Sequence, residues 1–185
     1  MDQATFRAYT AHAGEIARRH ASSRRVVAGI AQYFTRAFDP GDRILDVGAG
    51  AGGDLAWLVS EGYQAYGMEP VAEMRAEAIR AHPELRERLV EGSLPDALPD
   101  LASIGGRVLA SIPTLRTDID EAGRDPFGRL FSGVQAGELD LLFQRAGFRN
   151  LERWGEEDSL GRGGVVRWAT LLFELTDDGR AESSA

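Results

Sequence analysis

The feature that most constrains the fold is a glycine-rich turn that directly follows a short apolar strand. Arg43–Val47 (RILDV) has the composition of a buried strand, and residues 48–53 after it include four glycines. Asp54–Glu61 predicts a short helix, because its leucines recur at helical spacing. A strand, a glycine turn and a helix in this order are typical of a parallel sheet that binds ligands at the carboxyl ends of its strands.

The rest of the chain continues this alternation of strands and helices. We expect helices over residues 3–20, between Ser22 or Ser23 and Asp39, over Val71–Ala81 and over Gln135–Ala146. We expect further strands at Tyr63–Met68, Arg88–Glu91, Arg107–Ile112, Asn150–Trp154 and Val165–Leu175. In the last of the helices, the inward-facing residues should be Leu139, Leu142, Phe143 and Ala146. The order predicts an α/β sandwich of three layers, with a mostly parallel sheet and a C-terminal antiparallel β-hairpin.

Length and composition limit the domain organisation and the function. The 185 residues fit a single domain, with N-terminal helices at 1–38, a core at 39–175 and a flexible tail at 176–185. The net charge of -8 argues against nucleic acid or anionic lipid as partners. The absence of cysteine excludes thiolate catalysis, and the three histidines lie too far apart to predict a metal site. No apolar run is long enough for a membrane span or a signal core, so we expect a cytoplasmic protein.

Two kinds of cofactor fit the glycine turn. Gly48, Gly50 and Gly53 match the dinucleotide fingerprint G-x-G-x-x-G, which would favour a nucleotide-dependent oxidoreductase. Asp46 argues against that hypothesis, because a carboxylate two residues before the first glycine would repel a pyrophosphate. The same carboxylate suits S-adenosylmethionine, which has no phosphate and carries an ammonium and a sulfonium. Glu69, at the end of the second strand, can accept hydrogen bonds from both ribose hydroxyls of an adenosine.

Two segments resemble known motifs. Ile44–Asp54 (ILDVGAGAGGD) resembles motif I of the class I S-adenosylmethionine-dependent methyltransferases, and Tyr66–Met74 (YGMEPVAEM) resembles their second motif. The resemblance is close over residues 26–112 and looser over 135–175. It implies a Rossmann-like fold and methyl transfer from S-adenosylmethionine to an acceptor that we expect to be a small molecule. The alternative is a catalytically weak or inactive relative that binds S-adenosylmethionine or acts as a scaffold.

The resemblance also implies roles for individual residues. Asp46 would orient the methionine moiety, Glu69 would hold the ribose and Pro70 would line the adenine. The backbone of Gly48, Ala49 and Gly50 would pass against the cofactor, and Ser93 and Leu94 would lie near the adenine amino group. No catalytic residue can be assigned. Candidates on the acceptor side are Ser111, Thr114, Arg116, Asp118 and the loop to Arg124. Tyr9 and Tyr33 could form a lid, but we expect that they instead pack in the core or on the surface.

The middle of the chain departs from the family pattern. Residues 92–106 are too few for the fourth strand, two helices and loop that the family places there, and they offer no candidate for that strand. We therefore predict that one strand is missing and that Arg107–Ile112 lies beside the first strand. A sheet shortened in this way would leave an exposed edge, which favours a homodimer.

Overall fold

The computed structural model describes residues 2–22, 25–93, 106–131, 133–161 and 164–176. The chain divides into two compact units, Met1–Gly105 and Gly106–Ala185. Within the described residues, no helix is both long and apolar enough to cross a lipid bilayer. The organisation as a single domain stays a prediction from the sequence.

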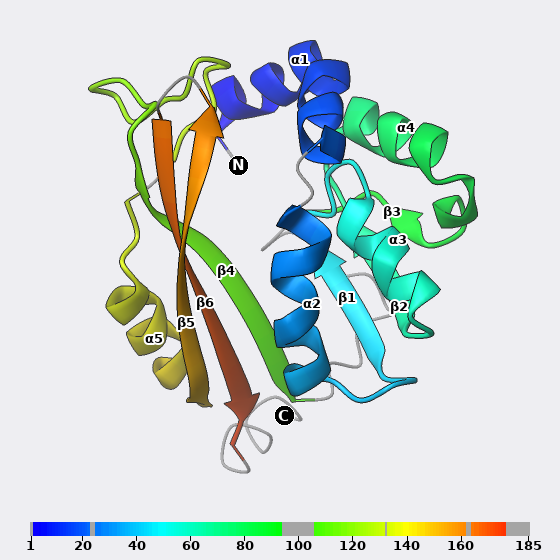
Figure 1. Ribbon diagram of the computed structural model, residues 1–185, viewed down its shortest axis with the longest axis vertical. Coiled ribbons are helices and arrows are strands. Elements are labelled where there is room, and N and C mark those ends of the chain that lie inside the picture. The colour runs from blue at the N-terminus through cyan, green and yellow to red at the C-terminus, as the bar shows by residue number, and fades with distance from the viewer. Residues whose placement is uncertain (1, 23–24, 94–105, 132, 162–163, 177–185) are drawn as a thin grey trace. The chain divides into compact units, whose positions relative to one another are not determined.

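The first unit contains a parallel sheet with helices (Figure 1). Its strands are β1 (Arg43–Val47), β2 (Gln64–Met68) and β3 (Leu89–Val90), which pair in the order β1-β2-β3. Its helices are α1 (Gln3–Ser22), α2 (Arg25–Ala37), α3 (Gly53–Ser60), α4 (Ala72–Ala81) and the short 3-10 helix η1 (Pro83–Leu85). The predicted β-α-β-α-β order is therefore confirmed, and all three carboxyl strand ends lie at one edge of the sheet.

Helix α3 lies very close to the strands. Its Leu55 and Leu58 are fully buried and pack with Ile44 and Ala65 of the sheet. Gly67 on β2 makes this close packing possible, because a Cβ atom there would lie 2.6 Å from Cδ2 of Leu55. This close packing of α3 on the sheet fixes the position of the glycine turn relative to the strand ends.

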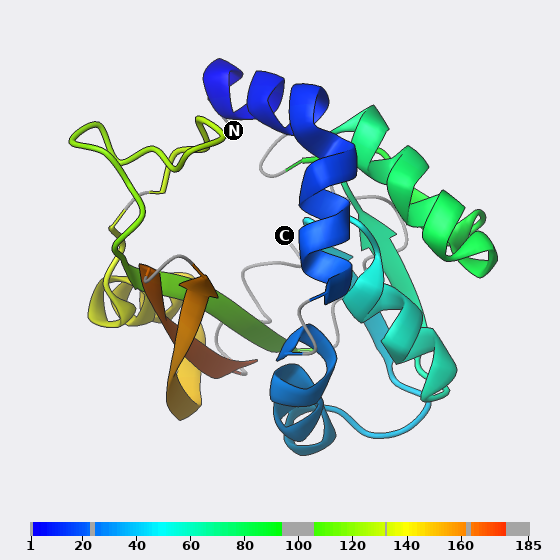
Figure 2. The ribbon, with the colours of Figure 1, turned by 45° about the horizontal axis from the view of Figure 1, so that its top comes forward.

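Helix α1 is interrupted at His12, where the backbone has φ -120° and ψ 15°. Beyond the interruption, Ala13 and Ile16 pack against Val71 and Met74, so α1 runs beside α4 in both views (Figures 1 and 2). Phe6, which lies before the interruption, is 41% exposed. The sequence predicted one helix over residues 3–20 and gave no indication of the break at His12.

The second unit contains an antiparallel sheet. Its strands are β4 (Arg107–Arg116), β5 (Phe148–Gly161) and β6 (Gly164–Leu175), paired in the order β4-β6-β5. The predicted C-terminal hairpin is confirmed as β5 and β6. The proposed place of Arg107–Ile112 beside the first strand stays a prediction, and residues 94–105 of the short middle segment lie outside the described residues.

Helix α5 (Ala136–Arg145) packs on this sheet through a narrow stripe. Ala136, Leu139 and Phe143 face Leu171 and Phe173 of β6, and the rings of Phe143 and Phe173 stack with centroids 4.1 Å apart. Leu142 was expected in this stripe, but it is 57% exposed, and Ala146 is exposed as well. The prediction failed because one stripe at i, i+3 and i+7 suffices to cover the narrow sheet.

Candidate ligand-binding site

A cavity of about 400 Å³ opens at the carboxyl ends of the three parallel strands. Four segments that lie apart in the sequence contribute to it, namely α1, the glycine turn, the end of β2 with the start of α4, and the residues after β3. The lining residues are Thr5, Tyr9, His20, Val47, Gly48, Gly50, Met68, Glu69, Pro70, Met74, Gly92 and Ser93. This is the place where the parallel-sheet pattern predicted a ligand.

The structure brings most of the expected site residues together. Gly48, Gly50, Glu69, Pro70 and Ser93 all line the cavity. Ala49 lies between two lining glycines, and Asp46 directly precedes the lining residue Val47. Leu94, the last expected site residue, lies outside the described residues.

The turn after β1 exposes backbone to the cavity. The N–H groups of Gly48 and Ala49 both donate to the carbonyl of Met68, at 2.8 and 3.1 Å, which ties the turn to the end of β2. Gly48 has a φ of 83°, which a residue with a side chain rarely adopts. A Cβ at Gly48 would meet nothing within 4 Å, so the space beside this backbone is open to a ligand.

Glu69 connects two of the strand ends. It is 6% exposed, and its Oε2 accepts a hydrogen bond from the Gly50 N–H at 3.1 Å while Oε1 accepts one from the Val71 N–H at 2.9 Å. Burial raises the pKa of Glu69, and these two backbone donors together with the charge of Arg75 oppose the rise. Each carboxylate oxygen keeps a second lone pair with which it can accept a ligand hydroxyl.

Two further carboxyl groups lie near the glycine turn. Burial, and secondly the charge of Glu69, raises the pKa of Asp46 to about 6. Burial, and secondly the charge of Asp46, raises the pKa of Asp54 to about 7. In the described part of the chain, no hydrogen bond reaches either carboxylate. Both residues are partly exposed, so a cation that enters the cavity can pair with these carboxylates.

Asp54 belongs to the quoted motif, and the sequence predicted for it only a role as a cap or as a negative charge at the start of its helix. The structure shows that it does not cap its helix, because the N-cap position of α3 is Gly52 and no side chain caps it. Its place in the first turn of α3, next to the glycines, was the only sequence signal that pointed to this site.

Helix α1 adds polar side chains to the cavity, and two of them, Thr5 and His20, were not indicated by the sequence. Thr5, Tyr9 and His20 line the cavity, from both sides of the interruption at His12. Tyr9 also packs against the buried cluster of Ala13 and Ile16, so the expected packing role describes only part of its surroundings. Tyr33 is buried, in agreement with the packing role expected for it.

The acceptor-side candidates lie in the second unit, where each already has a partner. Ser111 Oγ lies 3.1 Å from Thr170 Oγ1, and Thr114 Oγ1 donates to the Arg167 carbonyl at 3.3 Å. The Arg116 guanidinium donates to both Asp118 oxygens, at 2.8 and 2.6 Å. These contacts give all four residues a structural role.

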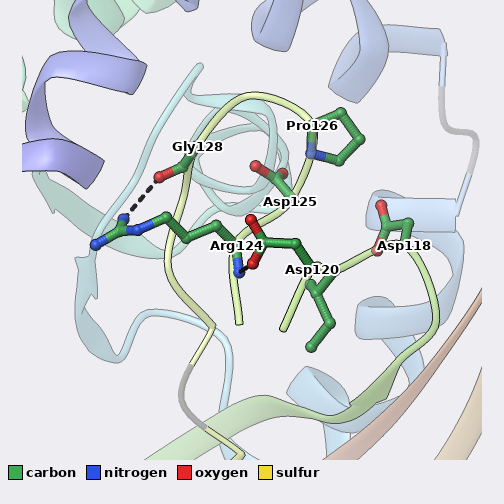
Figure 3. A pocket seen from close by; sticks show the side chains of 7 residues that line it. Asp118, Asp120, Arg124, Asp125, Pro126 and Gly128 are labelled. Atoms are coloured by element: carbon green, nitrogen blue, oxygen red, sulfur yellow. Dashed lines mark hydrogen bonds between the residues drawn. The ribbon is translucent and has the colours of Figure 1, made fainter. Parts of the chain in front are cut away.

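The loop after β4 is built from two successive turns with the pattern Asp-x-x-Gly-Arg. In the first, Asp120 Oδ1 accepts from the N–H groups of Ala122 and Arg124, at 2.9 and 2.8 Å. In the second, Asp125 Oδ1 accepts from those of Phe127 and Arg129, both at 3.0 Å. The two turns form the wall of a polar pocket of about 530 Å³ (Figure 3).

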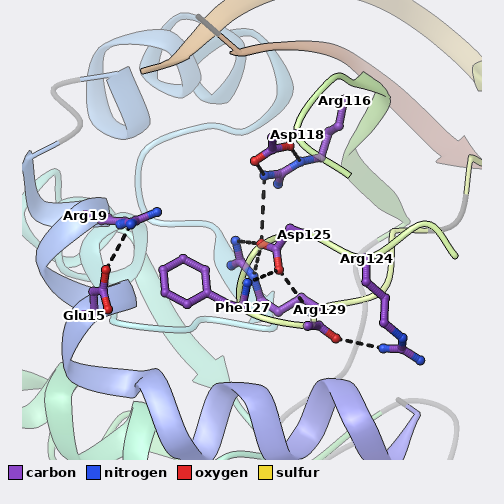
Figure 4. A network of polar contacts seen from close by, with 9 residues as sticks. Glu15, Arg19, Arg116, Asp118, Arg124, Asp125, Phe127 and Arg129 are labelled. Atoms are coloured by element: carbon purple, nitrogen blue, oxygen red, sulfur yellow. Dashed lines mark hydrogen bonds and ion pairs between the residues drawn. The ribbon is translucent and has the colours of Figure 1, made fainter. Parts of the chain in front are cut away.

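Ion pairs hold the second of these turns. Arg129 Nε donates to Asp125 Oδ2 at 2.8 Å, and Arg116 lies 4.0 Å from the same carboxylate (Figure 4). The Arg116 guanidinium also stacks over the Phe131 ring at 4.0 Å. The ion pairs among Arg116, Asp118, Asp125 and Arg129 thus help to hold the shape of this loop.

Comparisons with known proteins support the fold. No model of a protein family matches the sequence, and no curated protein matches it. The 1,6-didemethyltoxoflavin-N1-methyltransferase of Burkholderia thailandensis, whose structure has 1,6-didemethyltoxoflavin and S-adenosylhomocysteine bound, matches with a TM-score of 0.63. It is 17% identical, and the match covers 93% of this chain and 87% of that one.

Two other solved structures match over similar lengths. A TehB-like S-adenosylmethionine-dependent methyltransferase from Corynebacterium glutamicum has a TM-score of 0.60 and 16% identity, over 90% of this chain and 99% of its own. An S-adenosylmethionine-dependent methyltransferase from Anabaena variabilis has a TM-score of 0.62 and 11% identity, over 95% and 96%. At these identities the likeness concerns the fold alone.

Proposed function

We propose that this chain, which has the fold of the class I S-adenosylmethionine-dependent methyltransferases, binds S-adenosylmethionine and transfers its methyl group to a small-molecule acceptor. One observation carries the proposal. Asp46 and Asp54, beside the glycine turn, have raised pKa values and no hydrogen-bond donor in the described residues. Such a site calls for a cationic ligand, and S-adenosylmethionine carries two positive groups.

The residues present fit the parts of this cofactor. Asp46 takes the ammonium end, the backbone of Gly48, Ala49 and Gly50 lies along the ligand, and the spare lone pairs of Glu69 accept the ribose hydroxyls. Pro70 and Ser93 line the part of the cavity left for the adenine. A dinucleotide fits less well, because its pyrophosphate would meet the carboxylates at the turn.

When bound, S-adenosylmethionine supplies an electrophilic methyl group on its sulfonium. The contribution of the chain is to hold the acceptor atom in line with that group and to exclude water. Thr5, Tyr9 and His20 of α1 bring two hydroxyls and an imidazole to the same cavity, where they can orient a small polar acceptor. A volume of about 400 Å³ is within the range of small-molecule sites, which favours an acceptor of that size.

Calorimetric titration with S-adenosylmethionine and S-adenosylhomocysteine tests the proposal. The wild-type chain should bind both, and Asp46→Ala and Glu69→Ala should each lose at least tenfold in affinity. Glu61→Ala is the matched control, since Glu61 is an exposed carboxylate at the end of α3 and outside the cavity. A folded wild-type chain that binds neither compound would contradict the proposal.

An acceptor screen separates the enzyme from a binding protein. Methyl transfer from labelled S-adenosylmethionine to a pool of small molecules should be detectable by mass spectrometry. Binding without transfer to any acceptor would favour the scaffold, and methylation of RNA or DNA in preference to small molecules would contradict the proposed acceptor class.

A further inference from the structure

The backbone ladder between β2 and β3 ends where the candidate site begins. The Gly67 N–H donates to the Arg88 carbonyl at 2.8 Å, and the Glu69 N–H donates to the Val90 carbonyl at 3.1 Å. The pairing of the two strands stops at Met68 and Val90. The residues that line the cavity, Glu69 on one side and Ser93 on the other, therefore lie beyond the paired part.

Arg75 supplies the next connection from its side chain. Its Nη1 donates to the carbonyl of Glu69 at 2.7 Å, and its Nη2 donates to Glu91 Oε2, also at 2.7 Å. A planar guanidinium holds its donors in a fixed geometry, so the two bonds set the distance between the strand ends. Arg75 lies on α4, which begins just after Glu69.

A continuous polar chain thus crosses the three strand ends. Gly50 of the turn after β1 donates to Glu69, and Arg75 connects Glu69 to Glu91 after β3. The Arg75 side chain is only 17% exposed, whereas that of Glu91 is 75% exposed. Because Arg75 is the shielded partner, its position is fixed by the fold, and the more exposed Glu91 is the partner that it holds.

We propose that Arg75 is a positioning residue for the adenosine half of the cofactor. It keeps Glu69, which binds the ribose, at a set distance from Gly92 and Ser93, which follow Glu91 directly and line the adenine end. This inference rests on the proposed function. Arg75 does not touch the ligand itself, since it is not among the residues that line the cavity.

Adenosine is the probe that isolates this half of the site. Arg75→Leu should weaken binding of adenosine and of S-adenosylhomocysteine by the same factor, roughly tenfold. Asp46→Asn should weaken S-adenosylhomocysteine but leave adenosine unchanged, because adenosine has no ammonium. Arg75→Lys should recover part of the loss, since one ammonium can reach only one of the two partners at full strength.

Two more variants provide the comparison. Glu91→Ala removes one of the two bonds and should cost less affinity for adenosine than Arg75→Leu. Arg80→Leu is the matched control on the same helix, because Arg80 is exposed and, among the residues that the structure describes, pairs only with Glu77. It should leave the affinity for adenosine unchanged.

The pH profile of adenosine binding distinguishes positioning from general stability. The charge of Arg75 helps to lower the pKa of Glu69. In Arg75→Leu the pKa of Glu69 should therefore rise, and adenosine binding should be lost at a higher pH than in the wild type. A folded Arg75→Leu variant with wild-type affinity, or with an unmoved profile, would overturn the role of Arg75 alone. A wild-type chain that binds neither adenosine nor S-adenosylhomocysteine would overturn both this inference and the proposed function.

Discussion

At the scale of single residues, the ionised form of Asp46 lowers the stability of the folded chain. Its pKa in the folded chain is about 6, above the ordinary value of 3.8, so folding favours the protonated form. The stability that protonation adds is fully present below pH 3.8 and is lost as the pH rises through 6. In the absence of a bound cation, the charged carboxylate therefore destabilises the protein at neutral pH.

The variant Asp46→Asn should consequently be more stable than the wild type at pH 8. The gain is expected to be about 2 kcal/mol at pH 8, and roughly half of it should remain at pH 5, because there the unfolded chain has already lost the Asp46 proton while the folded chain still keeps it. Urea unfolding at the two pH values measures it, and Glu61→Gln serves as an exposed control. An equal effect of Asp46→Asn at pH 5 and pH 8 would show that packing, and not charge, causes the difference.

Ligand binding should show the opposite dependence on pH. A cationic ligand is attracted only to ionised carboxylates, and the pKa values of Asp46 and Asp54 are about 6 and about 7. The affinity for S-adenosylmethionine should therefore fall as the pH is lowered from 8 to 5, and calorimetry in matched buffers measures this. In the double variant Asp46→Asn and Asp54→Asn the affinity at pH 8 should already be low, and its dependence on pH should be much weaker.

At the scale of elements, the distance between α3 and the sheet depends on one glycine. A Cβ at Gly67 would lie 2.6 Å from Cδ2 of Leu55 and 3.0 Å from both Cβ of Ala49 and Cδ1 of Leu89. Gly67→Ala should therefore destabilise the chain by about 1–3 kcal/mol, because Leu55 is fully buried and cannot move aside.

Gly53→Ala is the control for that substitution. Gly53 begins α3 and has an ordinary helical backbone, and a Cβ there would meet nothing within 4 Å. This variant should be neutral or slightly more stable, since alanine restricts the unfolded chain. Urea unfolding of both variants checks the pair, and a similar loss in both would mean that the close packing at Gly67 is not the cause.

The sequence predicted the elements well where a periodic pattern met a clear stop. Arg43–Val47 coincides with β1, because a short apolar run lies between polar residues and a glycine turn. It failed at Leu142, where spacing alone could not tell how wide a stripe the sheet would cover. It also missed the break at His12.

At the scale of the whole chain, the sequence located the half of the site that two neighbouring motifs encode. Gly48, Gly50 and Glu69 come from neighbouring segments, and their chemistry points directly to a ligand. Thr5 and His20 reach the same cavity from an N-terminal helix, and no local pattern shows where such a helix docks. The bonds of Arg75 to Glu69 and Glu91 were likewise invisible, because they depend on the register of β2 and β3.

The homodimer stays a prediction from the sequence. Within the described residues, β4 and β5 are the outer strands of the second sheet, and an unpaired outer strand favours association. Sedimentation equilibrium at micromolar concentration should give twice the chain mass of 20.1 kDa. A single-chain mass at the highest soluble concentration would remove this expectation.

The paired turns after β4 have a consequence for how this chain can vary in length. Arg124 and Leu130 already face each other as an isolated antiparallel bridge, so the five residues between them, 125–129, form a loop whose ends nearly meet. Excising that segment would remove one acid and one base together, Asp125 and Arg129, and leave Arg116 with Asp118. Removing residues 125–129 would therefore leave the net charge of the chain unchanged.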